Sequence, residues 1–329
     1  MASERLLLAI DGGQTSTKAL VAQLDGTVIG AGRGSASDHF HIEGGIEKNR
    51  RAIHGAIKAA LTDAGASADQ VASIALGLTG CPPEGELRKP VYDIVGEIVS
   101  PERIWIGADY ITNLTGASAG GPGVVLVAGG GAISYGITAD GREALAGGFG
   151  YLLGDEGSAF KIGVAAIQAA SKANDKRGEP TSLERIVCDY FEIANIRQVT
   201  RIVYKAGFQR DRISLLTPLV AKAADDGDLV ALRILSDAGR SIGELAVGIA
   251  RQLFQPHEQV NIYYTGGVFN IGSNLFGSLI GELTEGIENW QLLDPRFQPA
   301  VGGLILAARE FGISVDEEWL SRVEATTKQ

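Results

Sequence analysis

Apolar and polar positions alternate in blocks near the start of the chain. An apolar run at residues 6–10 ends in Asp11-Gly12-Gly13, and apolar residues resume at 19–24 and 27–29, on either side of Asp25-Gly26. Asp-Gly between two apolar runs favours a two-residue hairpin of type I′, because both central positions of that turn need positive φ. The pattern therefore predicts a strand, a glycine turn, a second strand, a hairpin turn and a third strand.

The same pattern recurs about a third of the way along the chain. Apolar residues 124–128 run into Gly129-Gly130-Gly131-Ala132, and a strand-like run at 133–138 ends at Asp140-Gly141. Aligning Asp11 with Gly129 gives an offset of 118, and the two Asp-Gly turns match at 115. Two copies of one supersecondary unit predict two related domains that face each other. The alternative is that a glycine-rich chain forms strand–glycine turns often.

A third, shorter copy is open to both explanations. It consists of the apolar run 260–264 followed by Thr265-Gly266-Gly267. Elsewhere, apolar periodicity predicts strands at 71–78 and 103–107 and a small-residue helix from Pro299. Longer amphipathic stretches predict helices at 43–64, 87–99, 159–173, 182–193, 214–225 and 229–254.

Strands that alternate with helices after a hairpin predict α/β layers. The glycine-rich stretch 116–123 is a candidate hinge between two halves. We therefore expect an N-terminal domain at 1–117, with 300–329 packing back on it, and a C-terminal domain at 118–299. Each domain is expected to hold a mixed β-sheet flanked by helices.

Composition narrows the class of protein. The chain has 329 residues, enough for two cores, and its 45 glycines imply many tight turns. Its net charge of −10 argues against a nucleic-acid partner. Cys81 and Cys188 give neither a disulfide framework nor a metal-binding spacing. No apolar run approaches the roughly 20 residues of a membrane span, so no membrane association and a cytoplasmic location are expected.

The glycine turns carry the candidate chemistry. Glycine lets backbone N–H groups crowd toward a bound anion, so two such turns predict a cradle for a polyphosphate. The sequence contains neither a Walker A loop nor a dinucleotide fingerprint at these turns. Asp11 ends its strand where it could meet a metal-bound water. A further glycine-rich stretch, 146–159, surrounds the acid pair Asp155-Glu156.

These motifs together resemble the actin/sugar-kinase/Hsp70 superfamily, and specifically the N-acetylglucosamine kinase branch of the BadF/BadG/BcrA/BcrD ATPase family. The resemblance covers nearly the whole chain. Its most specific motif is the run 154–159, Gly-Asp-Glu-Gly-Ser-Ala, and the others are Asp11-Gly12-Gly13-Gln14-Thr15, Ile106-Gly107-Ala108-Asp109, Gly129-Gly130-Gly131-Ala132 and Thr265-Gly266-Gly267-Val268. It implies two duplicated ribonuclease-H-like (actin/hexokinase-type) domains with a cleft between them, ATP and Mg²⁺ as cofactors, a small-molecule sugar substrate and a homodimer.

The resemblance also implies a role for individual residues. Asp109 matches the general base that takes a proton from the sugar 6-hydroxyl, and Asp11 matches a ligand of Mg²⁺ through water. The residues implied to bind phosphate or nucleotide are Gly12, Gly13, Gln14, Thr15, Lys18, Gly129, Gly130, Gly131, Ala132, Gly266 and Gly267. Those implied to bind the sugar are Asp38, His39, Asp109, Gly148, Asp155 and Glu156.

Each role has a structural alternative. Asp109 could be a helix N-cap, Asp11 a turn acid, Lys18 a surface lysine, and Glu156 a cap for a helix that starts at 158. Among the remaining residues, an His39-x-His41 chelate is less favoured than a polar loop.

The chain departs from the pattern of the family at four positions. Gly130 and Ala132 replace hydroxyl residues at the second phosphate turn, Ile133 replaces an asparagine after it, and Asp38 replaces the asparagine of the first sugar loop. An acid beside the C2 substituent suits an ammonium. This interpretation predicts a higher kcat/KM for glucosamine than for N-acetylglucosamine.

Three other functions are open at this point. The family also contains ATPases that pass electrons to a radical dehydratase through an iron–sulfur cluster, and these need a cysteine near the nucleotide. Cys188 lies in a helical apolar pattern, which favours a core position. A kinase for another hexose, and a protein in which nucleotide only switches a binding surface, are the other two.

Overall fold

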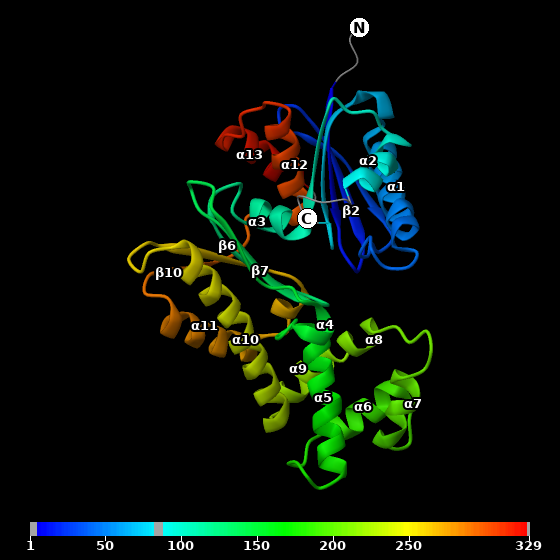
Figure 1. Ribbon diagram of the computed structural model, residues 1–329, viewed down its shortest axis with the longest axis vertical. Coiled ribbons are helices and arrows are strands. Elements are labelled where there is room, and N and C mark those ends of the chain that lie inside the picture. Colours follow the sequence, from blue (N-terminus) through cyan, green and yellow to red (C-terminus); the bar gives the residue numbers. More distant parts are fainter. Residues whose placement is uncertain (1–4, 82–87, 328–329) are drawn as a thin grey trace. The chain divides into compact units, whose positions relative to one another are not determined.

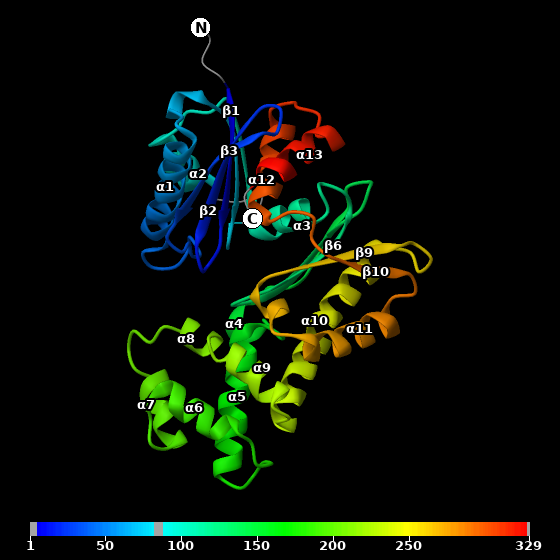
Figure 2. The ribbon, with the colours of Figure 1, turned by 180° about the vertical axis from the view of Figure 1, so that it is seen from behind.

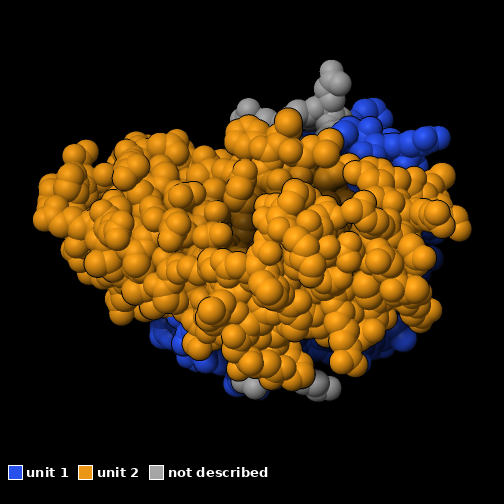
Figure 3. Space-filling view, turned by 90° about the horizontal axis from the view of Figure 1, so that it is seen from below, with its two compact units in different colours: residues 1–121, 294–329 blue, residues 122–293 orange. Residues whose placement is uncertain are grey.

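The structure is a computed structural model that describes residues 5–81 and 88–327. Its internal contacts divide the chain into two compact units, unit 1 (Met1–Gly121 with Asp294–Gln329) and unit 2 (Pro122–Leu293), which Figure 3 colours separately. Each unit contains a five-stranded mixed sheet flanked by helices (Figures 1 and 2). The α/β class with two similar sheets is therefore confirmed. The domain boundaries given above stay a prediction.

The sheet of unit 1 joins an antiparallel meander to two parallel strands. Its strands are β1 (Leu6–Gly12), β2 (Thr17–Gln23), β3 (Val28–Gly34), β4 (Val71–Leu78) and β5 (Arg103–Ala108), in the order β3-β2-β1-β4-β5. β2 is antiparallel to both β1 and β3, whereas β4 and β5 run parallel to β1. Leu8 and Leu7 belong to cores on opposite faces of the sheet. Burial on both faces explains why β1 is a continuous apolar run.

The sheet of unit 2 repeats this arrangement. Its strands are β6 (Gly123–Ala128), β7 (Ala132–Ile137), β8 (Glu143–Gly147), β9 (Val260–Thr265) and β10 (Trp290–Leu293), in the order β10-β9-β6-β7-β8. β6, β7 and β8 form the antiparallel meander, and β9 and β10 run parallel to β6. Both sheets therefore share one topology. The third strand–glycine copy, β9, is the equivalent of β4.

Helices cover both faces of the sheet in unit 1. α1 (Gly45–Ala64) and α2 (Arg88–Gly96) pack on the face that includes Leu8. α12 (Pro299–Glu310) and α13 (Glu317–Thr326) pack on the face that includes Leu7. α3 (Asp109–Ala117) follows β5 and packs on α12, where a Cβ at Gly302 would collide with the backbone of Thr112. α12 and α13 thus share one core with β1, although they are far from it in the sequence.

β3 lies close to α1 because the side chains at their contact are small. Gly30, Gly32 and Gly34 occupy alternate positions of β3, and alanines recur every fourth position of α1 from Ala52 to Ala64. A Cβ at Gly34 would collide with the carbonyl oxygen of Ala52. A Cβ at Gly32 would collide with backbone atoms of Ala56 and Ala60. Only glycine permits this approach of strand to helix.

Unit 2 contains a helical insertion between β8 and its longest helix, α10 (Leu229–Leu253), which packs on β7, β8 and α11 (Ser273–Gly286). Asp228 caps α10 by accepting hydrogen bonds from the N–H groups of Val230 (2.9 Å) and Ala231 (3.1 Å). None of the helices in residues 5–81 and 88–327 has the length and apolarity needed to cross a membrane. The insertion comprises α4 (Gly150–Leu153), α5 (Ala159–Asn174), α6 (Leu183–Phe191), α7 (Val199–Val203), α8 (Asp211–Ser214) and α9 (Thr217–Asp225).

The prediction of two-residue type I′ turns at Asp25-Gly26 and Asp140-Gly141 is wrong. Gln23 N–H donates to Thr27 O (2.9 Å) and Gly26 N–H to Gln23 O (3.1 Å), which makes a three-residue loop, Leu24 to Gly26. Gly26 has φ 94°, but Asp25 is not among the residues with positive φ. The loop around Asp140 has the same hydrogen bonds. A third loop residue spares the aspartate the left-handed conformation, which costs an L-residue free energy.

Two other expectations also need correction. In the sheets, Asp11 pairs with Lys18 as Val127 pairs with Ile133, so the residue equivalent to Asp11 is Val127, and the match to Gly129 is wrong by two residues. The predicted helix 214–225 begins three residues later than expected, since Ser214 is the last residue of α8 and α9 covers Thr217–Asp225, with Pro218 in its first turn. Leu87, at the start of another predicted helix, lies outside the described residues.

Candidate functional site

In unit 1, the carboxyl ends of three parallel strands bring two acids and a hydroxyl to one edge of the sheet. Asp11 is near the end of β1, Thr79 follows β4, and Asp109 follows β5. Thr79 N–H donates to Gly12 O (2.9 Å), and Thr79 Oγ1 donates to Asp109 Oδ2 (2.6 Å). The edge of the sheet therefore fixes the orientation of the Asp109 carboxylate.

The electrostatics of this edge raise the pKa of both acids. Burial raises the pKa of Asp11 to about 7, and the charge of Asp109 adds to this rise, while Lys18 opposes it. Burial also raises the pKa of Asp109, against the hydrogen bond from Thr79. Two carboxylates that burial has partly dehydrated are suitable oxygen ligands for a hard divalent cation. The charge of that cation would favour the ionised form of both. The donor set thus fits Mg²⁺.

The alternative role of Asp109 as a helix cap does not hold. α3 begins at Asp109 itself, and its N-cap is Ala108, which makes no side-chain cap bond. The carbonyl oxygen of Asp109 accepts hydrogen bonds from Thr112 Oγ1 (2.8 Å) and Asn113 Nδ2 (2.9 Å). These bonds hold the backbone of the residue, while its carboxylate accepts hydrogen bonds from Thr79 Oγ1 and from the backbone N–H of Tyr110.

The first glycine turn is short and partly exposed. Gly13 N–H donates to Ser16 O (3.1 Å), and the side chains of Gln14 and Thr15 are exposed. A Cβ at Gly12 would lie 2.6 Å from Leu78 Cδ2, so close packing on β4 requires this glycine. The structure gives neither Gly12 nor Gly13 a positive φ.

The first pair predicted to bind the sugar, Asp38 and His39, lies next to the loop that holds Thr79. A Cβ at Gly80 would collide with the imidazole of His39. Asp38 Oδ2 forms an ion pair with Lys48 Nζ (2.7 Å), and Asp38 Oδ1 accepts a hydrogen bond from His39 N–H (2.9 Å). Burial alone would raise the pKa of Asp38, but Lys48 and the His39 N–H outweigh it and hold the pKa below its usual value.

In unit 2, the second glycine turn meets two other predicted segments. Asp155 Oδ1 accepts a hydrogen bond from Ala132 N–H (3.3 Å), and a Cβ at Gly131 would lie 3.0 Å from Asp155 Oδ2. Gly129 O accepts a hydrogen bond from Ala159 N–H (2.8 Å), and a Cβ at Gly266 would collide with the carbonyl group of Ala128. The structure therefore gathers the residues 129–132, 154–159 and 266–267 around the end of β6.

Asp155 is held in an uncommon conformation. Its φ is 62°, a left-handed value that an aspartate tolerates better than most L-residues do. Burial raises its pKa, while the Ala132 N–H and the guanidinium of Arg210 oppose that rise. Gly148, with φ 74°, is exposed and donates its N–H to Ala132 O (3.1 Å). A strained residue beside a glycine turn is a frequent property of binding sites.

Other predicted residues lie further from these contacts. Glu156 is exposed, and the N-cap of α5 is Ser158, whose Oγ accepts a hydrogen bond from Lys161 N–H (3.2 Å). Glu156 is therefore not the cap of that helix. Gly267 is exposed at the start of a short 3₁₀ helix, Gly267–Asn270.

Sequence reasoning missed Thr79, Lys48 and Arg210. One signal could have found Thr79, namely a Thr-Gly pair at the end of a strand. Thr79-Gly80 follows β4, and Thr265-Gly266 stands at the end of β9, and both glycines have positive φ. The contacts of Lys48 and Arg210 have no such signal, because they depend on how a helix and a loop pack.

The two cysteines give no support to an iron–sulfur cluster. Cys81 belongs to unit 1 and Cys188 to unit 2. Burial raises the pKa of the Cys81 thiol to about 11, and burial with two nearby acids raises that of Cys188. A thiol must lose its proton to bind iron. Within residues 5–81 and 88–327, no group of three His, Cys, Asp or Glu side chains is arranged to hold a metal ion.

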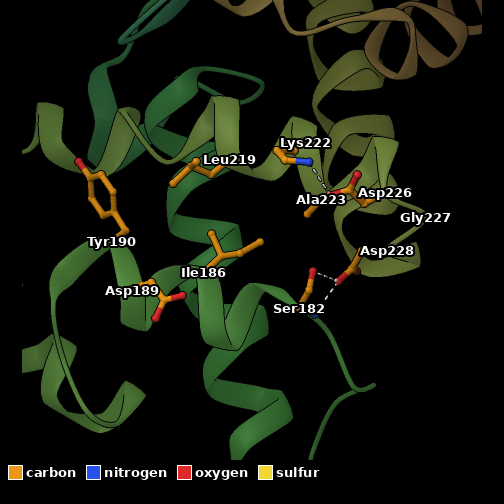
Figure 4. Close-up of a pocket in the computed structure, with 10 residues that line it drawn as sticks. All are labelled: Ser182, Ile186, Asp189, Tyr190, Leu219, Lys222, Ala223, Asp226, Gly227 and Asp228. Carbon is orange, nitrogen blue, oxygen red and sulfur yellow. Dashed lines mark hydrogen bonds and ion pairs between the residues drawn. The ribbon is translucent and has the colours of Figure 1, made fainter.

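The helical insertion of unit 2 holds a hollow of about 640 Å³ (Figure 4). Ile186, Leu219 and Ala223 form its apolar part, with charged groups at the rim. One of these, Asp228 Oδ2, already accepts hydrogen bonds from Thr181 Oγ1 and Ser182 (2.7 Å each). None of the predicted site residues lines this hollow.

Comparison with known proteins agrees with the motifs. Residues 8–307 match the BadF/BadG/BcrA/BcrD ATPase family. The chain is 28% identical to the N-acetylmuramic acid/N-acetylglucosamine kinase of Clostridium acetobutylicum (93% of this chain, 99% of that protein). It is 27% identical to the N-acetyl-D-glucosamine kinase of Dictyostelium discoideum (93% and 98%). A crystal structure from Chromobacterium violaceum, provisionally named N-acetylglucosamine kinase, matches with TM-score 0.75 and 29% identity (93% and 99%).

Proposed function

Because the chain belongs to the BadF/BadG/BcrA/BcrD ATPase family, we propose that it transfers the γ-phosphoryl group of ATP to the 6-hydroxyl of an N-acetylated amino sugar. The names of its relatives support the amino-sugar class. The observation that carries the proposal is the Asp109 carboxylate, held by Thr79 at the carboxyl end of β5 and beside Asp11. A carboxylate held in this way can accept the proton of a hydroxyl that attacks phosphorus.

In this mechanism Asp109 is the general base. Its raised pKa makes it a better proton acceptor than an ordinary carboxylate, and the hydrogen bond from Thr79 fixes the orientation of the carboxylate. Phosphoryl transfer depends mostly on positioning and on neutralising charge, and a base adds about 10²–10⁴-fold.

Asp11 would hold Mg²⁺, through water. The metal, when bound, neutralises charge on the phosphate oxygens. The chain's own part is to supply a carboxylate that burial has partly stripped of water and to keep Lys18 next to it.

The glycine turns would bind the nucleotide. In unit 1, the backbone at Gly12, Gly13, Gln14 and Thr15 and the ammonium of Lys18 would contact phosphate. In unit 2, Gly129 to Ala132 would contact phosphate, and Gly266 and Gly267 would contact the nucleoside. Backbone N–H groups can bind phosphate in an acidic protein, because they need no side-chain charge.

Asp38, His39, Gly148, Asp155 and Glu156 would bind the sugar. The ion pair of Asp38 with Lys48 removes the charge argument for glucosamine, because the carboxylate already has a cationic partner. A neutral acetamido group then suits this loop better than an ammonium, which Lys48 would repel. We therefore favour N-acetylglucosamine over glucosamine as the acceptor.

The test is a panel of sugars with ATP and Mg²⁺: N-acetylglucosamine, N-acetylmuramic acid, glucosamine and glucose. We expect the highest kcat/KM for an N-acetylated sugar. In Lys48→Met, which frees the Asp38 charge, the ratio of glucosamine to N-acetylglucosamine kcat/KM should rise, and the exposed Lys58→Met should leave it unchanged. Absence of phosphorylation on every amino sugar would contradict the proposal. The homodimer and the cytoplasmic location stay predictions.

A further inference from the structure

A row of three charged side chains crosses the sheet of unit 1 beside the first glycine turn. Asp11 on β1 pairs with Lys18 on β2, and Lys18 pairs with Arg33 on β3. Residues paired in this way point to the same face of a sheet, with Cβ atoms about 5 Å apart. The first half of the row, Asp11 with Lys18, is an attractive pair.

The second half of the row joins the half-buried Lys18 to the exposed Arg33. Lys18 and Arg33 are like charges in direct cross-strand register, which destabilises a sheet. Among the described residues, neither side chain forms an ion pair within 4.0 Å, so no carboxylate compensates the second cation.

Unit 2 shows that the shared topology does not require these charges. The equivalent row there is Val127, Ile133 and Gly147, in the same register across β6, β7 and β8. The same frame is thus built with no charge at any of the three positions. The cations of unit 1 are therefore an addition that the frame does not require.

Arg33 lies against the first glycine turn. Its Nη2 donates to Ser16 Oγ (3.3 Å), and Ser16 closes that turn by accepting the hydrogen bond from Gly13 N–H. Lys18 and Arg33 also line one hollow of about 300 Å³, together with Gln298 and Ala300 at the start of α12. Two cations, a turn rich in N–H groups and an open volume occur at one place.

We infer that Lys18 and Arg33 form a two-cation clamp that binds the β-phosphate group of the nucleotide. The inference rests on the proposed function and extends it, because Arg33 has no role in the glycine-turn motif. A phosphate placed against both cations would remove their mutual repulsion and gain two charge-assisted hydrogen bonds. Arg33 is suited to this task, since its planar guanidinium can bind Ser16 and a phosphate at the same time.

Binding of ADP and AMP, measured by calorimetry with Mg²⁺, tests the clamp. In Arg33→Gln, the Kd for ADP should rise about tenfold and that for AMP less than about twofold, because AMP lacks the phosphate that the clamp binds. The dependence of the ADP Kd on salt should also become weaker than in the wild type. Arg103→Gln is the matched control, since Arg103 is exposed at the opposite end of the same sheet.

Two further variants separate charge from structure. Arg33→Lys should recover part of the ADP affinity, because it keeps the charge. Ser16→Ala removes the hydrogen bond to Arg33 and should change the ADP Kd less than Arg33→Gln does. An equal loss in Ser16→Ala and Arg33→Gln would show that Arg33 only holds the turn, and would overturn the clamp.

The outcomes also separate this inference from the proposed function. An unchanged ADP Kd in Arg33→Gln, with sugars still phosphorylated, overturns the clamp alone. Arg33-dependent binding of ADP without phosphorylation of any sugar supports the clamp and overturns the proposed kinase activity. A wild-type protein that binds neither ADP nor AMP contradicts both, and binding of inorganic phosphate that competes with AMP as strongly as with ADP contradicts the β-phosphate assignment.

Discussion

The two sheets of this protein have the same strand order and the same strand directions, yet they differ in what they carry at the turn end of the meander. Unit 1 places Asp11, Lys18 and Arg33 on a row that unit 2 fills with Val127, Ile133 and Gly147. Because the chain contains two sheets of one topology, the effect of the topology can be distinguished from that of the side chains placed on it. The topology sets where side chains lie, and substitution at a few strand ends decides whether those side chains are charged or apolar.

A second difference concerns how the meander is covered. In unit 1 the glycines are on the strand and the alanines on the helix, α1. In unit 2 this is reversed, since Ala146 of β8 faces Gly248 of α10 at an ordinary contact distance of 3.7 Å for a Cβ built on the glycine. Both solutions bring a helix close to an edge strand, but the first leaves no room for any added atom.

The largest expected effect sharpens the contrast between the acids of the two units. Asp109→Asn should lower kcat by about 10²–10⁴-fold while the Kd for ATP stays nearly unchanged, because the amide cannot accept the proton. Asp155→Asn should instead raise KM for the sugar, since asparagine tolerates the left-handed conformation and keeps the backbone in place. Steady-state kinetics on the favoured sugar measures both, and turnover retained in Asp109→Asn contradicts the assignment of the base.

The next effect tests the packing of β3 on α1. Gly34→Ala should lower the free energy of unfolding by about 1–3 kcal/mol, because its Cβ would collide with the carbonyl oxygen of Ala52 and the strand must move away. Denaturant unfolding followed by circular dichroism measures the change. A variant as stable as the wild type would show that the two elements separate freely.

A smaller effect concerns the start of the long helices. α1 begins after Gly44, which has no side-chain cap, whereas Asp228 caps α10 and also binds Thr181 and Ser182. Asp228→Ala should cost about 1 kcal/mol at pH 7. Burial alone would raise the pKa of Asp228, but its hydrogen bonds lower it to about 2. The ionised form is therefore the stabilising one.

The sign of the pH dependence follows from this lowered pKa. The stability that Asp228 contributes is fully present above the pKa of an unfolded aspartate, about 4, and is lost as pH falls toward 2. The difference in unfolding free energy between wild type and Asp228→Ala should thus be constant from pH 7 to 5 and shrink below pH 4. A difference that grows on acidification would contradict the role of the cap.

The smallest effect is expected where β8 packs on α10 in unit 2. Gly248→Ala should keep the free energy of unfolding or raise it by up to about 1 kcal/mol, because alanine favours a helix and its Cβ has space. The same denaturant series measures it. A loss as large as that of Gly34→Ala would remove the contrast between the two packings.

Much of the frame was readable from the sequence because strands and glycine turns leave local patterns. The repeated run into glycine, as at Asp11-Gly12-Gly13 and Gly129-Gly130-Gly131, predicted two similar sheets before any coordinates. The loop at Asp25-Gly26 was misjudged because a dipeptide does not determine whether a third residue joins the turn. Its hydrogen bonds depend on the register of the flanking strands.

The partners of the site residues were less accessible to sequence reasoning. Thr79 meets Asp109 only because β4 and β5 are neighbours that end at one edge. Lys48 reaches Asp38 from the first turns of α1, and Arg33 reaches Ser16 across a hairpin. Such contacts follow from the packing of whole elements, so the acids could be named while the groups that tune them could not.

The core around Leu7 and Ala9 has a consequence for how the protein is made. One face of the first sheet is covered by α12 and α13, which are synthesised long after its strands. β1 and the strands beside it therefore keep an apolar surface in water until about 290 further residues have been added, while unit 2, continuous in sequence, can fold in the meantime. During that interval the exposed sheet face can associate with other chains, so the unfinished protein is more prone to aggregation than the completed one.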